Sequence, residues 1–203
     1  MHVQHARFLR HTGGQYLQVI DERPKGRPVV PDDYRRLGRL LTELGKRTAD
    51  VGVPLAYHHH MNSTGEKPQE VRAVLDAADA RQVRLLFDVA HYQQGGGDPA
   101  AAIREYREWI EVVHLKDVRD AAAPGDRSGG SGRSGGAGGG YEFVELGRGR
   151  VDLPGVFAAL RDIAFEKWAI VELDRVPDPS GTPRASAEMN KRYLVERARL
   201  AMH

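Results

Sequence analysis

Short apolar runs alternate along the chain with longer amphipathic stretches. The runs predicted as strands are 16–20 (YLQVI), 53–57 (VPLAY), 83–87 (VRLLF), 112–115 (VVHL) and 168–173 (WAIVEL). The predicted helices cover 6–11, 33–51, 68–80, a stretch from Asp98 through Trp109, a stretch capped by Asp152, and 186–202. In the helical stretches, leucine, valine and isoleucine recur at helical spacing between charged residues. Strands that alternate with helices in this order predict a parallel β-sheet covered by helices.

The spacing between strand ends indicates the type of parallel fold. Tyr57 and Phe87 lie 30 residues apart, and His114 follows 27 residues after Phe87. A (β/α)8 TIM barrel of about 250 residues divides into units of this size. The chain holds about five such units, so we predict an α/β fold of the TIM-barrel type that is incomplete and lacks the N-terminal three units. An open doubly wound sheet is the alternative, because a barrel with strands missing leaves two unpaired edges, and periodicity does not separate the two.

One tract of the chain has a composition unlike the rest. Residues 124–140 read PGDRSGGSGRSGGAGGG, which offers no apolar surface to bury. We therefore expect a disordered Gly/Ser-rich insertion at about 121–140, in a surface loop of one domain that covers residues 1–203. The tract lacks the fixed glycine spacing between a strand and a helix that phosphate-binding loops need, which makes a nucleotide-binding domain the least favoured interpretation.

Composition restricts the classes of function. Of the 203 residues, 40% are hydrophobic and 29% charged, and the formal net charge of +2 comes without a long basic run, so we expect no nucleic-acid partner. The chain has neither an apolar stretch of about 18 residues nor an apolar N-terminal signal, so we expect a cytoplasmic protein with no membrane partner. Because cysteine is absent, carboxylate, histidine and lysine side chains remain for chemistry, and any metal must bind oxygen and nitrogen.

Ionisable residues follow four successive predicted strands. They are His58, His59, His60 and Glu66 after the second strand, Asp88 and His91 after the third, His114, Lys116 and Asp117 at the fourth, and Glu172 and Asp174 at the last. In parallel α/β folds, function collects at the carboxyl ends of the strands, so these groups are expected at one rim. Carboxylates with imidazole suit Mn²⁺, Mg²⁺ or Co²⁺, and zinc is a further option.

Several of these residues also have a purely structural interpretation. Strand alternation sends His58 and His60 to one face of the sheet and His59 to the other. Asp88 ends an apolar strand, where a metal, an arginine or the start of a helix would each offset the cost of burying a carboxylate. His114 lies between apolar residues, as many structural histidines do. Because Asp88 and His114 are 26 residues apart, a shared metal site forms only when the sheet assembles.

Five segments together resemble a known family. They are YHHHMNSTGE (57–66), LLFDVAHYQQGGGDP (85–99), VVHLKDVRD (112–120), ELGRGRVDLPGVFAAL (145–160) and WAIVELDR (168–175). In this order they resemble the xylose-isomerase-like TIM barrels, which are sugar (phosphate) isomerases and epimerases. Within that family the pattern is similar to the inosose dehydratase branch. Two positions depart from it: Val89-Ala90 stands where Thr-Gly is usual, and Asn62-Ser63 where Gly-Thr is common.

The resemblance implies a divalent metal, Mn, Co or Mg with Zn as a further option, at the strand ends. Its ligands map to Glu66, Asp88, His114 and Glu172, and His58 or His60 is the alternative to Glu66. The implied substrate is a small hydroxy-ketone sugar or cyclitol, whose enediolate charge the metal would stabilise.

The same resemblance implies roles in proton transfer. Glu172 or Glu66 is expected to remove the proton from carbon, and the residues expected to deliver protons and bind substrate oxygens are His58, His60, His91 and Lys116. Return of the proton gives isomerisation or epimerisation, whereas loss of a β-hydroxyl gives dehydration, as in an inosose dehydratase.

The predicted incompleteness of the barrel supports a second hypothesis. The chain would then be a catalytically inactive, truncated remnant that acts as a binding or oligomerising module. Unpaired strand edges near residues 16–20 also predict a homo-oligomer, because free backbone N–H and C=O groups pair readily with another chain.

Overall fold

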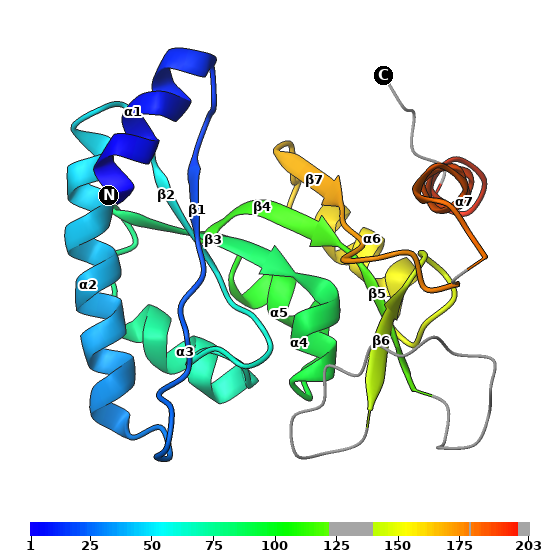
Figure 1. The fold of residues 1–203 in the computed structure, drawn as a ribbon, viewed down its shortest axis with the longest axis horizontal. Helices are drawn as coiled ribbons and strands as arrows, with labels where there is room; N and C mark the ends of the chain where they lie inside the picture. Colours follow the sequence, from blue (N-terminus) through cyan, green and yellow to red (C-terminus); the bar gives the residue numbers. More distant parts are fainter. Residues whose placement is uncertain (122–139, 179, 199–203) are drawn as a thin grey trace.

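A five-stranded parallel sheet forms the centre of the protein (Figure 1). The computed structural model describes residues 1–121, 140–178 and 180–198. The strands, in their order across the sheet, are β1 (Leu17–Val19), β2 (Leu55–His58), β3 (Val83–Asp88), β4 (Ile110–Leu115) and β7 (Trp168–Val171). All five lie within the strands that the apolar runs predict, or extend past them by one or two residues.

The strand order distinguishes between the two fold types left open by the sequence. Each new strand of this sheet joins the edge formed by the strand before it, and the direction never reverses. A doubly wound sheet reverses direction at a switch point, whereas a TIM barrel adds its strands in one direction. The sheet is therefore half of a TIM-like barrel, and the doubly wound alternative is wrong. That three N-terminal units are missing stays a prediction.

Helices cover one face of the sheet. They are α1 (His2–Thr12), α2 (Pro31–Ala49), α3 (Pro68–Asp76), α4 (Val89–Gln94), α5 (Pro99–Glu105), α6 (Leu153–Asp162) and α7 (Pro183–Glu196). The predicted caps are confirmed, because Asp98 accepts from Ala101 N and Asp152 from Gly155 N. Helix α5 ends four residues earlier than expected, in a turn that leads into β4. Among the described residues, no helix combines the length and apolar character needed to cross a bilayer.

Three elements were not predicted from the sequence. Helix α4 begins directly after β3, and β5 (Asp117–Asp120) pairs with β6 (Tyr141–Val144) in a separate antiparallel sheet. Residues 121–140, which link β5 to β6, carry the predicted Gly/Ser-rich insertion. The prediction that this insertion is disordered concerns residues 122–139, which lie outside the described part of the chain.

Alternation along the strands gives the sheet two faces with different roles. Tyr57, Phe87 and Val113 belong to the main core shared with the helices. Alternate positions face the other way, where Leu86 and Val112 belong to a small separate apolar cluster. This second face is the concave side of the half-barrel, and it continues at the strand ends into His58, Asp88 and His114.

The concave face is partly uncovered at β7. Trp168 and Ile170, the register partners of Val112 and His114, are 56% and 37% exposed. The indole Nε1 of Trp168 donates to Gln15 Oε1 at 2.6 Å, just before β1. Because β1 and β7 are the two edge strands, this hydrogen bond shows that the sheet curls until its edges approach each other at the amino ends of the strands.

Candidate active site

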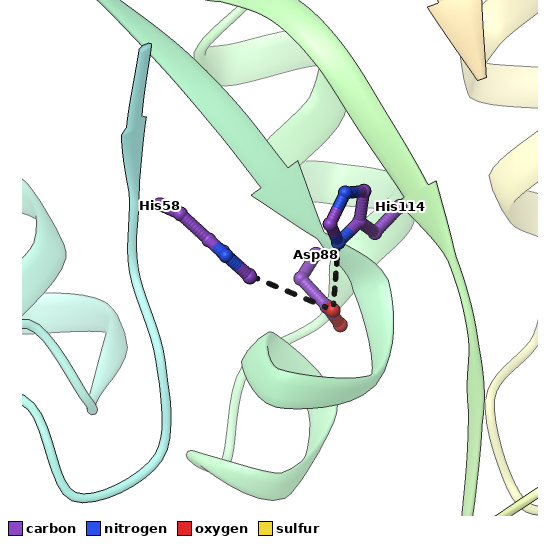
Figure 2. Close-up of side chains that lie close together, drawn as sticks. All are labelled: His58, Asp88 and His114. Atoms are coloured by element: carbon purple, nitrogen blue, oxygen red, sulfur yellow. Dashed lines mark ion pairs between the residues drawn. The ribbon is translucent and has the colours of Figure 1, made fainter. Parts of the chain in front are cut away.

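Three side chains from neighbouring strand ends meet on the concave face (Figure 2). The Oδ2 atom of Asp88 lies 3.7 Å from His58 Nε2 and 3.6 Å from His114 Nδ1. One nitrogen or oxygen of each residue lies within 4.8 Å of those of the other two, and all three side chains are buried. Two imidazoles and a carboxylate at these separations form a group able to share one cation.

The two oxygens of Asp88 have different partners. Oδ1 accepts hydrogen bonds from the backbone N–H groups of Ala90 and His91, both at 2.8 Å, and so caps α4. Oδ2 has no hydrogen-bond donor among the described residues, although Asp88 is fully buried, and the same holds for His58 Nε2. Buried polar atoms without partners are costly, and a cation between them would offset that cost. The residues present therefore fit a bound divalent metal.

Electrostatics keeps Asp88 and His58 in the protonation states that metal binding requires. Burial raises the pKa of Asp88, but the electrostatic effect of the surrounding imidazoles and of Lys116 outweighs it and holds this pKa well below its usual range. Burial lowers the pKa of His58, which favours the neutral imidazole. An ionised carboxylate and a neutral imidazole are the forms that bind a metal.

Glu172, which directly follows β7, lies at the rim of the cluster. Its Oε2 atom is 2.6 Å from His114 Nδ1 and 3.4 Å from Lys116 Nζ, and its side chain is 34% exposed. Burial alone would lower the pKa of His114, but the carboxylates of Asp88 and Glu172 raise it to about 9. The structure thus brings Asp88, His114 and Glu172 together, as strand-end spacing predicted.

Lys116 is a fully buried cation beside the cluster. Its Nζ atom lies 2.6 Å from Asp174 Oδ1, 4.0 Å from Asp88 Oδ2, and 4.1 Å from the centre of the Phe143 ring. Burial lowers the pKa of Lys116, but the negative charges of Asp88 and Glu172 outweigh it and raise the pKa above its usual value. The ammonium group therefore stays charged next to the proposed cation position.

His60 and His91 form the third side of the site. Their rings are in contact at a tilt of 43°, with centroids 3.7 Å apart, and His91 Nε2 lies 3.9 Å from Asp88 Oδ2. His91 is buried, whereas His60 is half-buried. His59 lies on the opposite face, as alternation predicted, and there it packs against Phe87. Burial lowers the pKa of His59 to about 3.

Glu66 is the expected ligand that the structure leaves outside the cluster. Its carboxylate accepts a hydrogen bond from Asn62 N at 2.7 Å and pairs with Arg23 Nη1 at 3.3 Å. The loop that carries Glu66 folds back onto Arg23, so its charge is already compensated. In its place β2 presents His58, which the sequence offered as an alternative.

One contact of the cluster was not predicted from the sequence. The side-chain Nε2 of Gln18 lies 2.9 Å from His58 Nδ1, on the far side of the ring from Asp88. Contacts of this kind hold the ring of a metal-binding histidine in place. The signal was a lone polar residue inside the apolar run YLQVI, in register with Ala56 on the concave face.

The raised pKa of His114 predicts a dependence of stability on pH. In the metal-free protein this imidazole titrates at about 9, against 6.5 for an ordinary histidine. Folding therefore stabilises its protonated form, and this contribution is complete below pH 6.5 and lost as the pH rises to 9. We expect a decrease in unfolding free energy of at most about 3 kcal/mol across that range.

Urea unfolding of the metal-free protein at several pH values between about 6.5 and 9 measures this decrease. The lowered pKa values of His58, His59 and His91 keep those rings neutral there, so they do not produce it. The variant His114→Gln should show a much flatter profile. An equally steep profile in that variant would contradict the assignment to His114.

The fold and the cluster together define a class of protein: a half-barrel of the TIM type with an oxygen- and nitrogen-ligand group at its strand ends. The chain belongs to the xylose isomerase-like TIM barrel family, whose model matches residues 3–193. The resemblance seen in the sequence motifs is thereby confirmed.

The sequence is similar to those of two named bacterial proteins. The chain is 34% identical over 192 residues to the rhizopine catabolism protein MocC of Rhizobium meliloti, covering 95% of this chain and 57% of that protein. It is 30% identical over 176 residues to an inosose dehydratase of Lacticaseibacillus casei, covering 87% and 57%. The chain thus spans little more than half the length of these relatives.

Solved structures share the fold. The IOLI protein with a bound zinc atom has a TM-score of 0.75 at 19% identity, covering 98% of this chain and 69% of that one. The probable 3-DHS dehydratase AsbF from Bacillus anthracis has a TM-score of 0.71 at 16% identity, covering 96% and 68%. At these sequence identities, the structural similarity supports the TIM-barrel fold alone and does not assign an activity.

Proposed function

We propose that this chain carries the metal centre of an enzyme that acts on a hydroxy-ketone sugar or cyclitol. The observation that carries the proposal is the buried Asp88 Oδ2, which lies between His58 and His114 and has no hydrogen-bond donor in the part of the chain that the structure describes. The metal would be held by these three residues and by Glu172. Mn²⁺, Co²⁺ or Mg²⁺ suits this set of ligands, and the zinc in the IOLI structure makes Zn²⁺ a further option.

The bound cation would supply stabilisation of the negative charge that develops on the substrate oxygen. Glu172, partly exposed at the rim, is the group we assign to remove the proton from the carbon beside the carbonyl. Lys116 places its ammonium beside Glu172 and binds a substrate oxygen. His60 and His91 lie on the other side of Asp88, where they deliver or accept a proton at a second oxygen.

Dehydration of an inosose is the reaction that the relatives favour. Several of them are named inosose dehydratases, and a structural neighbour is named a probable dehydratase. Other neighbours are named epimerases or sugar phosphate isomerase/epimerases. Proton removal next to a carbonyl is the step common to all three outcomes. The inactive-remnant alternative is less well supported, because the relatives are named as enzymes and the strand ends bring His58, Asp88 and His114 together.

Deuterium exchange tests the proposed step directly. The protein, loaded with Mn²⁺, is incubated in D₂O with an inosose and followed by proton NMR. We expect loss of the signal from the carbon next to the carbonyl, and elimination of water if the reaction is a dehydration. Chelation of the metal should stop both.

Paired histidine variants make this test specific. His58→Ala should lose bound Mn²⁺, measured by elemental analysis, together with the exchange. His5→Ala, at an exposed position of α1, should keep both. Absence of exchange in Mn²⁺-loaded protein for inososes and for ketoses alike would contradict the proposed function, and absence of bound metal would contradict the proposed site.

A further inference from the structure

Asp174 is a carboxylate of the site to which the proposed chemistry gives no role. It lies just beyond β7, is 44% exposed, and holds Lys116 Nζ at 2.6 Å. Lys116 has two other carboxylates nearby, but Glu172 Oε2 is 3.4 Å and Asp88 Oδ2 is 4.0 Å away. The shortest contact of this buried ammonium is therefore to Asp174, which, unlike Asp88 and Glu172, forms no ion pair with an imidazole among the described residues.

The proposed cation creates a conflict for Lys116. A cation held by Asp88 and Glu172 would share both carboxylates with the ammonium group, which lies 4.0 Å from Asp88 Oδ2 and 3.4 Å from Glu172 Oε2. Two positive groups at such separations repel each other strongly in a buried site. Once the cation occupies Asp88 and Glu172, those two carboxylates no longer compensate the charge of Lys116. A buried ammonium without a counter-ion is costly, so the site needs a third carboxylate.

We propose that Asp174 is a positioning residue that holds Lys116 to one side and so leaves Asp88 and Glu172 free for the metal. This inference rests on the proposed metal site. Lys116 and Asp174 form a compensated pair, with the Phe143 ring 4.1 Å from the ammonium. Without Asp174, the ammonium turns to Glu172 and Asp88 and competes with the cation for them.

Metal titration of four proteins tests the inference. Mn²⁺ affinity is measured by electron paramagnetic resonance for the unchanged chain, Asp174→Asn, Lys116→Met, and the double variant. We expect Asp174→Asn to weaken Mn²⁺ binding about tenfold or more, in the range found when groups beside metal ligands are removed. The double variant should recover most of the affinity, because the competing ammonium is gone. Asp174→Glu should retain part of it.

Asp162→Asn is the matched control. Asp162 is also exposed and also pairs with a basic side chain, Arg104, at 2.7 Å, but it lies at the end of α6. This variant removes the same charge and a similar ion pair, and it should bind Mn²⁺ as the unchanged chain does. Circular dichroism spectra of all variants are compared with that of the unchanged chain to check that each variant is folded.

Three results would overturn the inference. Unchanged Mn²⁺ affinity in Asp174→Asn would show that Lys116 needs no such partner. Equally weak binding in Asp174→Asn and in the double variant would show that Asp174 acts without Lys116. Failure of the unchanged chain to bind Mn²⁺ would remove the metal site itself, and this separates failure of the proposed function from failure of the positioning role.

Discussion

Replacing Asp88 by asparagine is expected to weaken Mn²⁺ binding more than about 100-fold and to abolish turnover. The carboxylate is fully buried, and its Oδ2 faces His58 and His114 without a hydrogen-bond donor among the described residues. Asparagine keeps a side-chain oxygen that can cap α4, so the fold should persist. It removes the negative charge that attracts the cation, so the variant should lose Mn²⁺ affinity and not its fold.

Isothermal titration with Mn²⁺ measures this loss, and unfolding in urea checks the fold. Asp98→Asn is the matched control, because Asp98 caps α5 through Ala101 N at 3.1 Å in the way that Asp88 caps α4. It should bind Mn²⁺ normally. If Asp88→Asn binds Mn²⁺ as tightly as Asp98→Asn, the metal lies elsewhere.

Glu172→Gln should have the second largest effect, and this effect falls on the rate. At saturating Mn²⁺ we expect kcat to fall about a hundred- to ten-thousandfold, because the amide cannot accept the proton from carbon. Loss of one ligand should also weaken Mn²⁺ binding, so the rate is compared at metal concentrations that fill the site. Steady-state turnover of an inosose and deuterium exchange measure the change.

Glu111→Gln provides the comparison for Glu172. Glu111 lies on β4 towards the opposite end of the sheet and pairs with Lys167 at 2.8 Å. Its loss removes one carboxylate from the same sheet without touching the cluster, so kcat should be unchanged. A Glu172→Gln protein that keeps its kcat would assign proton removal to another residue.

The strands could be predicted from sequence because parallel, buried strands leave continuous apolar runs. The side-chain alternation that separates His58 from His59 follows from the geometry of any strand. The pairing of Asp88 with His114 required only that neighbouring parallel strands end together, and the two are register partners in the structure. These features depend on local periodicity and on one rule of sheet topology.

Other features depend on contacts that no local pattern encodes. Helix α4 has only six residues, too few for a helical pattern of apolar positions to be recognised. The glycine-rich tract lies between β5 and β6 in the sequence, so their pairing could not be predicted from neighbouring residues. Glu66 was expected at the metal because of family resemblance, yet Arg23, more than forty residues earlier in the chain, neutralises it. Asp174 was expected at the strand ends, but the positioning role proposed for it rests on its distance to Lys116, which no local pattern encodes.

The arrangement of the two sheets restricts where the length of this chain can vary. One residue added within β3 would turn Asp88 away from the concave face and bring the neighbouring apolar residue there instead. The hairpin of β5 and β6 belongs to a separate sheet, so residues added at its tip leave the alternation of β2, β3 and β4 intact. Related chains should therefore tolerate insertions and deletions at that tip, and almost none inside the strands that carry the ligands.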